Sequence, residues 1–91
     1  MGVDKTDIKK LFKVLTDLVD EKDCEIFLND LCTNKEIEQM AQRLMAAECL
    51  LNGDTYETVI KKTDISSATL SRVSRCVKYG EGYKKVLNAD K

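Results

Sequence analysis

Proline is absent from this chain of 91 residues, and glycine occurs at only four positions. Since these two residue types mark most tight turns, a chain with so few of them favours long helices over many short strands. Aromatic residues make up only 5% of the sequence, which argues against a β-sandwich core. The length allows one small domain. We therefore expect a single all-α domain, residues 1–91, of about six helices.

The first half of the chain has the periodicity of three helices. Apolar residues define one stripe on the first helix, with charged residues on the opposite face. Asp20 begins a second, shorter helix, and residues 33–36 (TNKE) form a capping box that begins a third. The third helix ends at Asn52-Gly53, a common C-terminal stop. The stripe of the first helix consists of Ile8, Leu11, Phe12, Leu15, Leu18 and Val19.

The second half of the third helix lacks a polar face. From Met45 to Leu51 every residue except Glu48 is apolar or small. A helix that is apolar all round must be covered on several sides, and a chain of this length has few elements left to cover it. The segment fits either the central helix of a monomer or a homodimer in which partner helices supply the cover. We favour the homodimer, with residues 1–53 as its dimerisation helices.

The formal net charge of −1 hides an asymmetry between the two halves of the chain. Residues 1–54 carry 7 basic and 12 acidic side chains, whereas residues 55–91 carry 8 basic and 4 acidic ones. The basic half is therefore the candidate surface for a polyanion.

Residues 56–79 have the spacing of a helix-turn-helix, in which two short helices pack at a steep angle around a tight turn. We predict helices over 56–62, capped by Asp54 or Thr55, and over 68–79, capped by Ser67. A last helix is predicted from about Tyr83 to Ala89. Residues 54–91 would thus form a DNA-reading head and a C-terminal helix. The predicted apolar contacts of the helix-turn-helix are Val59, Ile60, Ile65, Leu70 and Val73.

Two residues depart from the usual helix-turn-helix pattern. Asp64 stands in the turn where Gly is usual, although Asp tolerates the left-handed backbone conformation better than most residues. Ile60 stands where Ala is usual, which would set the two helices slightly wider apart.

The second helix of this motif presents a face suited to a major groove. Its start is small and polar, which allows close approach to base edges, and its later positions carry long cations. Ser66 and Ser67 place hydroxyls and free N–H groups where a phosphate could bind. The alternative is a solvated helix face without a partner. The candidate DNA-binding residues are Lys61, Ser66, Ser67, Ala68, Thr69, Ser71, Arg72, Arg75 and Lys78.

Other functional classes find little support. There is no His, no Gly-rich phosphate loop, and no Ser or Cys with an obvious base, so we expect no catalytic site and no enzyme. The four cysteines form no CxxC pair, so no metal site is expected, and we place each in a helix as a reduced, small apolar residue. No cofactor is indicated. No signal peptide or membrane-length apolar run is visible, so we expect a cytoplasmic protein with no membrane contact.

Several segments together resemble the Trp repressor superfamily, and in particular its branch of short Trp-repressor-like bacterial proteins. The resemblance extends from about Leu11 to Tyr83. It implies an intertwined homodimer whose two helix-turn-helix heads face successive major grooves. The segments that carry it are residues 31–36 (LCTNKE), 42–44 (QRL), 50–53 (LLNG) and 69–80 (TLSRVSRCVKYG).

The same resemblance places a possible amino-acid site at Thr33, Arg43 and Arg72, positions that surround the bound tryptophan in the family's namesake. The residue after Arg72 is Gly in the namesake and Val73 here. A branched side chain at this position fills the volume that the indole ring would need, and overpacking costs about 1–3 kcal/mol. We therefore expect DNA binding that does not require tryptophan, with any other small-molecule effector left open.

The sequence thus predicts a bacterial transcriptional regulator, a repressor, that binds a palindromic double-stranded DNA operator as a homodimer. The alternative is a helical protein-interaction module whose basic face binds an acidic protein partner.

Overall fold

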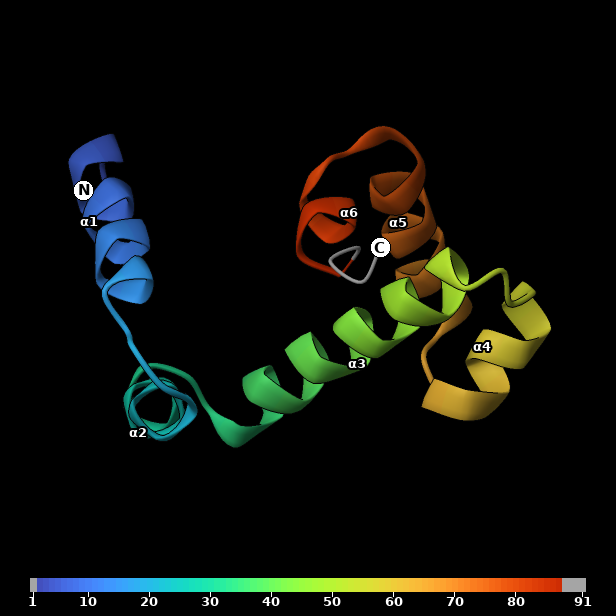
Figure 1. Ribbon diagram of the computed structural model, residues 1–91, viewed down its shortest axis with the longest axis horizontal. Helices are drawn as coiled ribbons and strands as arrows, with labels where there is room; N and C mark the ends of the chain where they lie inside the picture. Colours follow the sequence, from blue (N-terminus) through green and yellow to red (C-terminus); the bar gives the residue numbers. More distant parts are fainter. Residues whose placement is uncertain (1, 88–91) are drawn as a thin grey trace. The chain divides into compact units, whose positions relative to one another are not determined.

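The computed structural model describes residues 2–87, which form six helices and no strand (Figure 1). The predicted all-α class and number of helices are confirmed. The chain divides into two compact units, Met1–Ile37 and Glu38–Lys91. The helices are α1 (Lys5–Thr16), α2 (Glu21–Leu31), α3 (Asn34–Leu51), α4 (Tyr56–Thr63), α5 (Ser67–Tyr79) and α6 (Gly82–Leu87).

Helix α1 is shorter than its apolar stripe. Asp4 caps its start, accepting a hydrogen bond from the Asp7 amide at 3.0 Å. The helix ends at Thr16. Asp17 is its C-cap residue, and the Asp17 amide donates to the Lys13 carbonyl at 3.1 Å. Leu18 and Val19 therefore lie outside the helix, and the prediction that they extend its stripe was wrong. The spacing of the apolar residues does not mark this end of the helix.

Side-chain caps fix the starts of the next two helices, as predicted. Asp20 accepts from the Asp23 amide at 2.8 Å and begins α2. Thr33 and Glu36 form the expected capping box, in which each side chain accepts from the other residue's amide, at 2.8 and 3.1 Å. Cys32, predicted within a helix, is instead the extended C-cap residue of α2, with φ −118°. Cys32 lies outside the helices because the capping box of Thr33 and Glu36 begins α3 at Asn34, only two residues later.

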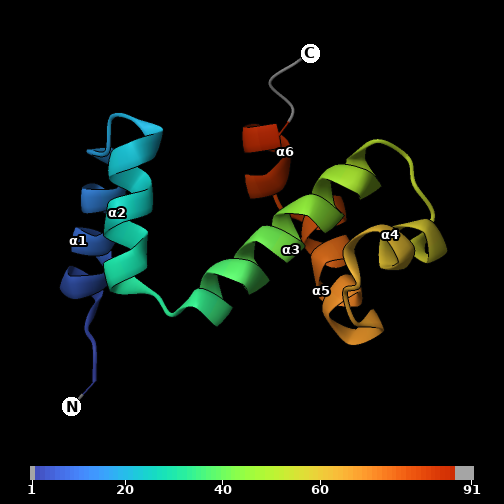
Figure 2. The same ribbon diagram turned by 90° about the horizontal axis from the view of Figure 1, so that it is seen from below.

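The hydrophobic core of the chain lies in the second unit. No residue of α1 or α2 is buried. The second half of α3 packs with α4 and α5 instead, and Figure 2 shows the three helices around one centre. Leu50, Leu51 and Cys49 are partly buried against this core. The buried apolar residues among residues 2–87 are Ala46, Ala47, Val59, Ile65, Leu70, Val73 and Val77.

Glycines end the two longest helices of this unit. Gly53 follows α3 with φ +95°, a conformation that other residues rarely adopt. At Gly80, which ends α5, an added Cβ would lie 2.8 Å from the carbonyl oxygen of Cys76, so a side chain would force the backbone to move. Helix α6 follows, one residue earlier in its start than predicted, and the predicted end at Ala89 lies outside the described residues.

Candidate nucleic-acid interface

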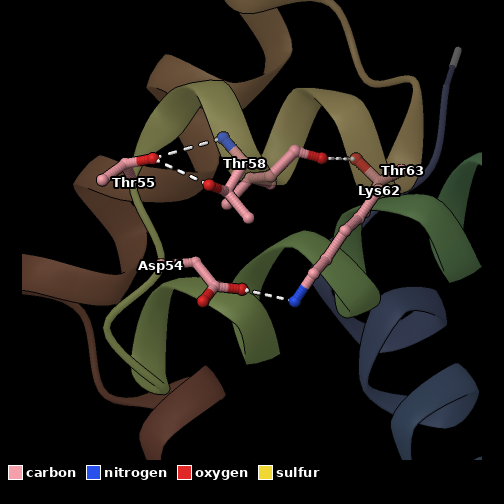
Figure 3. Close-up of polar contacts among 6 residues, drawn as sticks. Asp54, Thr55, Thr58, Lys62 and Thr63 are labelled. Carbon is pink, nitrogen blue, oxygen red and sulfur yellow. Dashed lines mark hydrogen bonds and ion pairs between the residues drawn. The ribbon is translucent and has the colours of Figure 1, made fainter.

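Helices α4 and α5 form the predicted helix-turn-helix, and hydroxyl side chains cap both. Thr55 accepts from the Thr58 amide at 3.2 Å and its hydroxyl donates to that of Thr58 at 3.0 Å (Figure 3). Ser66 caps α5 in the same way, accepting from the Thr69 amide at 3.2 Å. Ser67, which we predicted as the cap, is the first residue of the helix. The two serines are neighbours of the same type, so the sequence alone could not choose between them.

The turn between the two helices is held by short contacts. Asp64 adopts the left-handed conformation, with φ +59° and ψ +25°, as its residue type allowed us to predict. Its amide donates to the Ile60 carbonyl at 2.8 Å. The Thr63 hydroxyl donates to the Val59 carbonyl at 2.8 Å and accepts from the Ile65 amide at 3.3 Å. The turn therefore has a defined conformation that sets where α5 begins.

Four of the five predicted apolar contacts lie in the core, and Ile60 does not. Val59 and Leu70 are fully buried, whereas Ile60 is 36% exposed. Adjacent positions on a helix point about 100° apart, so Val59 and Ile60 cannot both face α5. Thr63, one turn after Val59, occupies the buried position that we assigned to Ile60.

The candidate recognition face of α5 is exposed. Leu70, Val73 and Val77 are buried on the opposite side, as predicted. Of the candidate residues, Thr69 is half-buried and contributes to the cap of α5. The exposed candidates are Ser66, Ser67, Ala68, Ser71, Arg72, Arg75 and Lys78 on or beside α5, and Lys61 on α4.

This face carries positive charge without acidic neighbours on the same helix. Helix α5 contains Arg72, Arg75 and Lys78 and no Asp or Glu. Within residues 2–87 the ion pairs are Lys13–Asp17 and Lys62–Asp54, so these three cations are not paired. Because DNA carries one phosphate charge about every 1.7 Å along its axis, unpaired cations on one helix face suit its backbone.

The neighbouring lysines of α4 differ in their surroundings. Lys62 lies 3.0 Å from the Asp54 carboxylate, which precedes the helix (Figure 3). This hydrogen bond, and then the charge of Asp54, raise the pKa of Lys62 above its ordinary value of 10.5. Lys61 makes no such pair among the described residues. The Asp54 carboxylate thus offsets the charge of Lys62, whereas Lys61 is unpaired within residues 2–87.

Cys49 lies beside the same ion pair. Burial of the thiol is the main cause that raises its pKa above the ordinary value of 9.0. A hydrogen bond to Asp54 adds to this effect, and the charge of Lys62 opposes it. No sequence motif indicates the contact of Cys49, Asp54 and Lys62, which is formed by the turn after α3, where the Asp54 amide donates to the Cys49 carbonyl at 3.0 Å, and by the side chain of Lys62 on α4.

The residues of the possible amino-acid site fall in different parts of the chain. Thr33 belongs to the first unit, where its side chain caps α3. Arg43 and Arg72 belong to the second unit, where Arg43 is half-buried on α3 and Arg72 is exposed on α5. Val73 is 1% exposed and part of the core, as its predicted packing role requires.

Residues 2–87 contain neither a metal cluster nor a membrane-spanning helix. No group of three or more His, Cys, Asp or Glu side chains there could hold a metal ion. In the same range, no helix combines the length and hydrophobicity needed to cross a membrane.

The sequence and the fold of this chain are both similar to those of known proteins. The family model described as "Trp repressor protein" matches residues 6–91. The uncharacterized protein YerC of Bacillus subtilis (strain 168) is 40% identical over 92 residues, covering 97% of this chain and 88% of YerC.

Two crystal structures share the fold. A proposed Trp repressor from Staphylococcus aureus has a TM-score of 0.89 and 33% identity, over 94% of this chain and 87% of that one. A TrpR-like protein from Eubacterium eligens ATCC 27750 has a TM-score of 0.88 and 35% identity, over 93% of this chain and 89% of that one.

Proposed function

The chain belongs to the Trp repressor family, and on this basis we propose that it is a DNA-binding transcriptional regulator of the bacterial cytoplasm. It acts as a repressor, binding a palindromic operator in double-stranded DNA as a homodimer. The observation that carries the proposal is the face of α5, where Arg72, Arg75 and Lys78 are exposed and unpaired within residues 2–87. The residues proposed to contact DNA are Lys61, Ser66, Ser67, Ala68, Thr69, Ser71, Arg72, Arg75 and Lys78.

The first turn of this face differs in chemistry from its later turns, in a way that suits recognition of a specific base sequence. Its first turn is small and polar, so the backbone can approach the base edges in the major groove. The cations follow on later turns, where guanine and phosphate oxygens would be in reach. In the family namesake the base contacts are largely water-mediated, and the short hydroxyls of Ser67 and Ser71 suit such bridging waters.

A homodimer would account for the apolar side chains that one chain leaves in solvent. On α1, Phe12 is 59% exposed and Ile8 is 44% exposed. On α3, Met45 is 49% exposed and Leu44 is 44% exposed, although Ala46 and Ala47 beside them are fully buried. An open apolar groove of about 480 Å³ also lies in the second unit. Its lining residues are Leu44, Cys76, Gly80, Gly82, Tyr83 and Val86.

A dimer also determines the form of the operator. A two-fold symmetric protein reads two half-sites of inverted sequence, whose centres lie about 34–36 Å apart on one side of the duplex. In this arrangement residues 1–53 supply the dimerisation helices and residues 54–91 the head and the C-terminal helix. We propose no catalytic step for the protein.

Selection of bound sequences from a pool of random duplexes tests the proposal. A bound motif with inverted half-sites about 10 base pairs apart supports it. The affinity for the selected duplex should then fall by about 10³–10⁵ between 50 and 200 mM salt if 6–10 phosphates are contacted. Recovery of random sequences with no enriched motif would contradict operator binding and favour the other candidate, a module whose basic face binds an acidic protein.

A further inference from the structure

Gln42 on α3 is joined to the turn of the helix-turn-helix by a single hydrogen bond. Its side-chain Nε2 donates to the backbone carbonyl oxygen of Thr63 at 2.9 Å. Among the side-chain hydrogen bonds of residues 2–87, this one spans the longest stretch of chain, 21 positions. Both residues belong to the second unit, where Gln42 is half-buried and Thr63 is 9% exposed.

The acceptor is one of the carbonyl groups that a helix leaves without a partner. The last four carbonyls of an α-helix have no amide within the helix to accept from, and Thr63 is the last residue of α4. The Ile60 carbonyl is satisfied by the amide of Asp64, at 2.8 Å. The Thr63 carbonyl is satisfied by Gln42, a side chain from another helix. Gln42 therefore caps the C-terminal end of α4.

The side chain of Thr63 also makes two hydrogen bonds within the helix-turn-helix. The Thr63 hydroxyl contacts the Val59 carbonyl at 2.8 Å and the Ile65 amide at 3.3 Å. Thr63 is thus fixed by its side chain to the head and by its backbone to α3. This junction lies shortly before α5, which begins at Ser67 and also packs with α3 through the core.

We propose that Gln42 is a positioning residue for DNA recognition, which holds the turn so that α5 is presented in the orientation needed for specific readout. The inference rests on the proposed function and deepens it. Gln42 is not among the residues proposed to contact DNA, and it acts through Thr63.

The test uses the full-length protein, the selected operator and an unrelated duplex of the same length. Gln42→Met keeps the length of the side chain but removes the donor, and Gln42→Lys restores a donor. Gln39→Met is the matched control, an exposed glutamine on the same helix. For each variant we compare the affinities for the two duplexes and follow backbone amide exchange by NMR. Far-UV circular dichroism confirms that each variant is folded.

For Gln42→Met we expect operator affinity to fall by about 3–10-fold, the range of one hydrogen bond, with binding to the unrelated duplex unchanged. Exchange at the amides of Asp64 and Ile65 should become faster. Gln42→Lys should recover most of the ratio between the two affinities, and Gln39→Met should behave as the wild type. A Gln42→Met protein that keeps the wild-type ratio would overturn the inference and leave the proposed function intact. A wild-type protein that selects no operator would overturn both.

Discussion

The ammonium group of Lys62 lies 3.0 Å from the carboxylate of Asp54, whereas the adjacent Lys61 has no acidic partner within residues 2–87. The pair joins the segment before α4 to the last turn of that helix. Two lysines that are neighbours in the sequence therefore have different surroundings, and we predict different roles for them.

This difference predicts opposite effects of two matched substitutions. Lys61→Ala should weaken DNA binding at all sequences and reduce the slope of log affinity against log salt by about 1, because one phosphate contact is lost. Lys62→Ala should leave that slope nearly unchanged and lower the melting temperature slightly. DNA titrations of both variants at several salt concentrations measure the slope, and thermal melts measure the melting temperature. Equal loss of slope in the two variants would contradict the assignment.

Arg75→Ala should reduce operator affinity by about 1–3 kcal/mol if the guanidinium reads a base. Because Arg75 is exposed, the free energy of unfolding should change by less than about 0.5 kcal/mol. Fluorescence anisotropy with the selected operator measures the first quantity and denaturant unfolding the second. Lys22→Ala, which removes an exposed cation from α2, serves as the charge-matched control. Large loss of stability with unchanged affinity would show that Arg75 belongs to the fold and not to the interface.

The exposed stripe of α1 predicts a dimer in solution. Light scattering at micromolar concentration should give twice the chain mass of 10.3 kDa. Phe12→Asp, which places a charge where the side chain is 59% exposed in one chain, should shift the mass toward that of one chain. Lys10→Asp, on the opposite face of the same helix, should leave the mass unchanged. A folded wild-type monomer under these conditions would rule out the interlocked arrangement.

Millimolar L-tryptophan should change neither the melting temperature nor the operator affinity. The buried side chain of Val73, 1% exposed, occupies core volume beside Arg72 in the sequence. A ligand at 100 times its dissociation constant would stabilise the protein by about 2.7 kcal/mol per site, which is several degrees for a domain of this size. Differential scanning fluorimetry with and without L-tryptophan, with L-leucine as the control, detects such a shift. A shift specific to tryptophan, with tighter operator binding, would refute the prediction.

The Cys49 thiol predicts a loss of stability in alkali. Its pKa is raised in the folded protein above the ordinary value of 9.0, chiefly by burial. Its contribution is therefore fully present below pH 9.0 and is lost as the pH rises through the folded-state pKa. The melting temperature of the wild type should fall more steeply above pH 9 than that of Cys49→Ala, under reducing conditions. Parallel curves for the two proteins would show that Cys49 does not contribute.

Features encoded within a few residues could be predicted from the sequence. The Thr33–Glu36 capping box, the left-handed Asp64 and the buried face of α5 all depend on residue types at short spacing, and each is confirmed. Leu18 and Ile60 were misplaced for the opposite reason. The spacing of apolar residues does not show that α1 ends before Leu18. It also does not show which of the adjacent residues Val59 and Ile60 is buried.

Contacts between distant segments were beyond prediction. The hydrogen bond from Gln42 to Thr63 joins residues 21 positions apart, and neither residue type is unusual where it stands. Cys49, Asp54 and Lys62 are closer in the chain, where the amide of Asp54 donates to the Cys49 carbonyl at 3.0 Å, but no motif in the sequence indicates their contact. The DNA contacts and the site of Thr33, Arg43 and Arg72 remain predictions, since they depend on groups outside this chain.

Helices α1 and α2 bury no side chain within their own chain. Segments with few buried contacts open locally at little cost in free energy and are the first to be cut by proteases. A newly made chain that has not yet acquired cover for these helices is therefore exposed to degradation through its N-terminal unit. If a second copy covers these helices, as we propose, the lifetime of the protein in the cell depends on its own concentration, since that cover becomes available only as the chain accumulates.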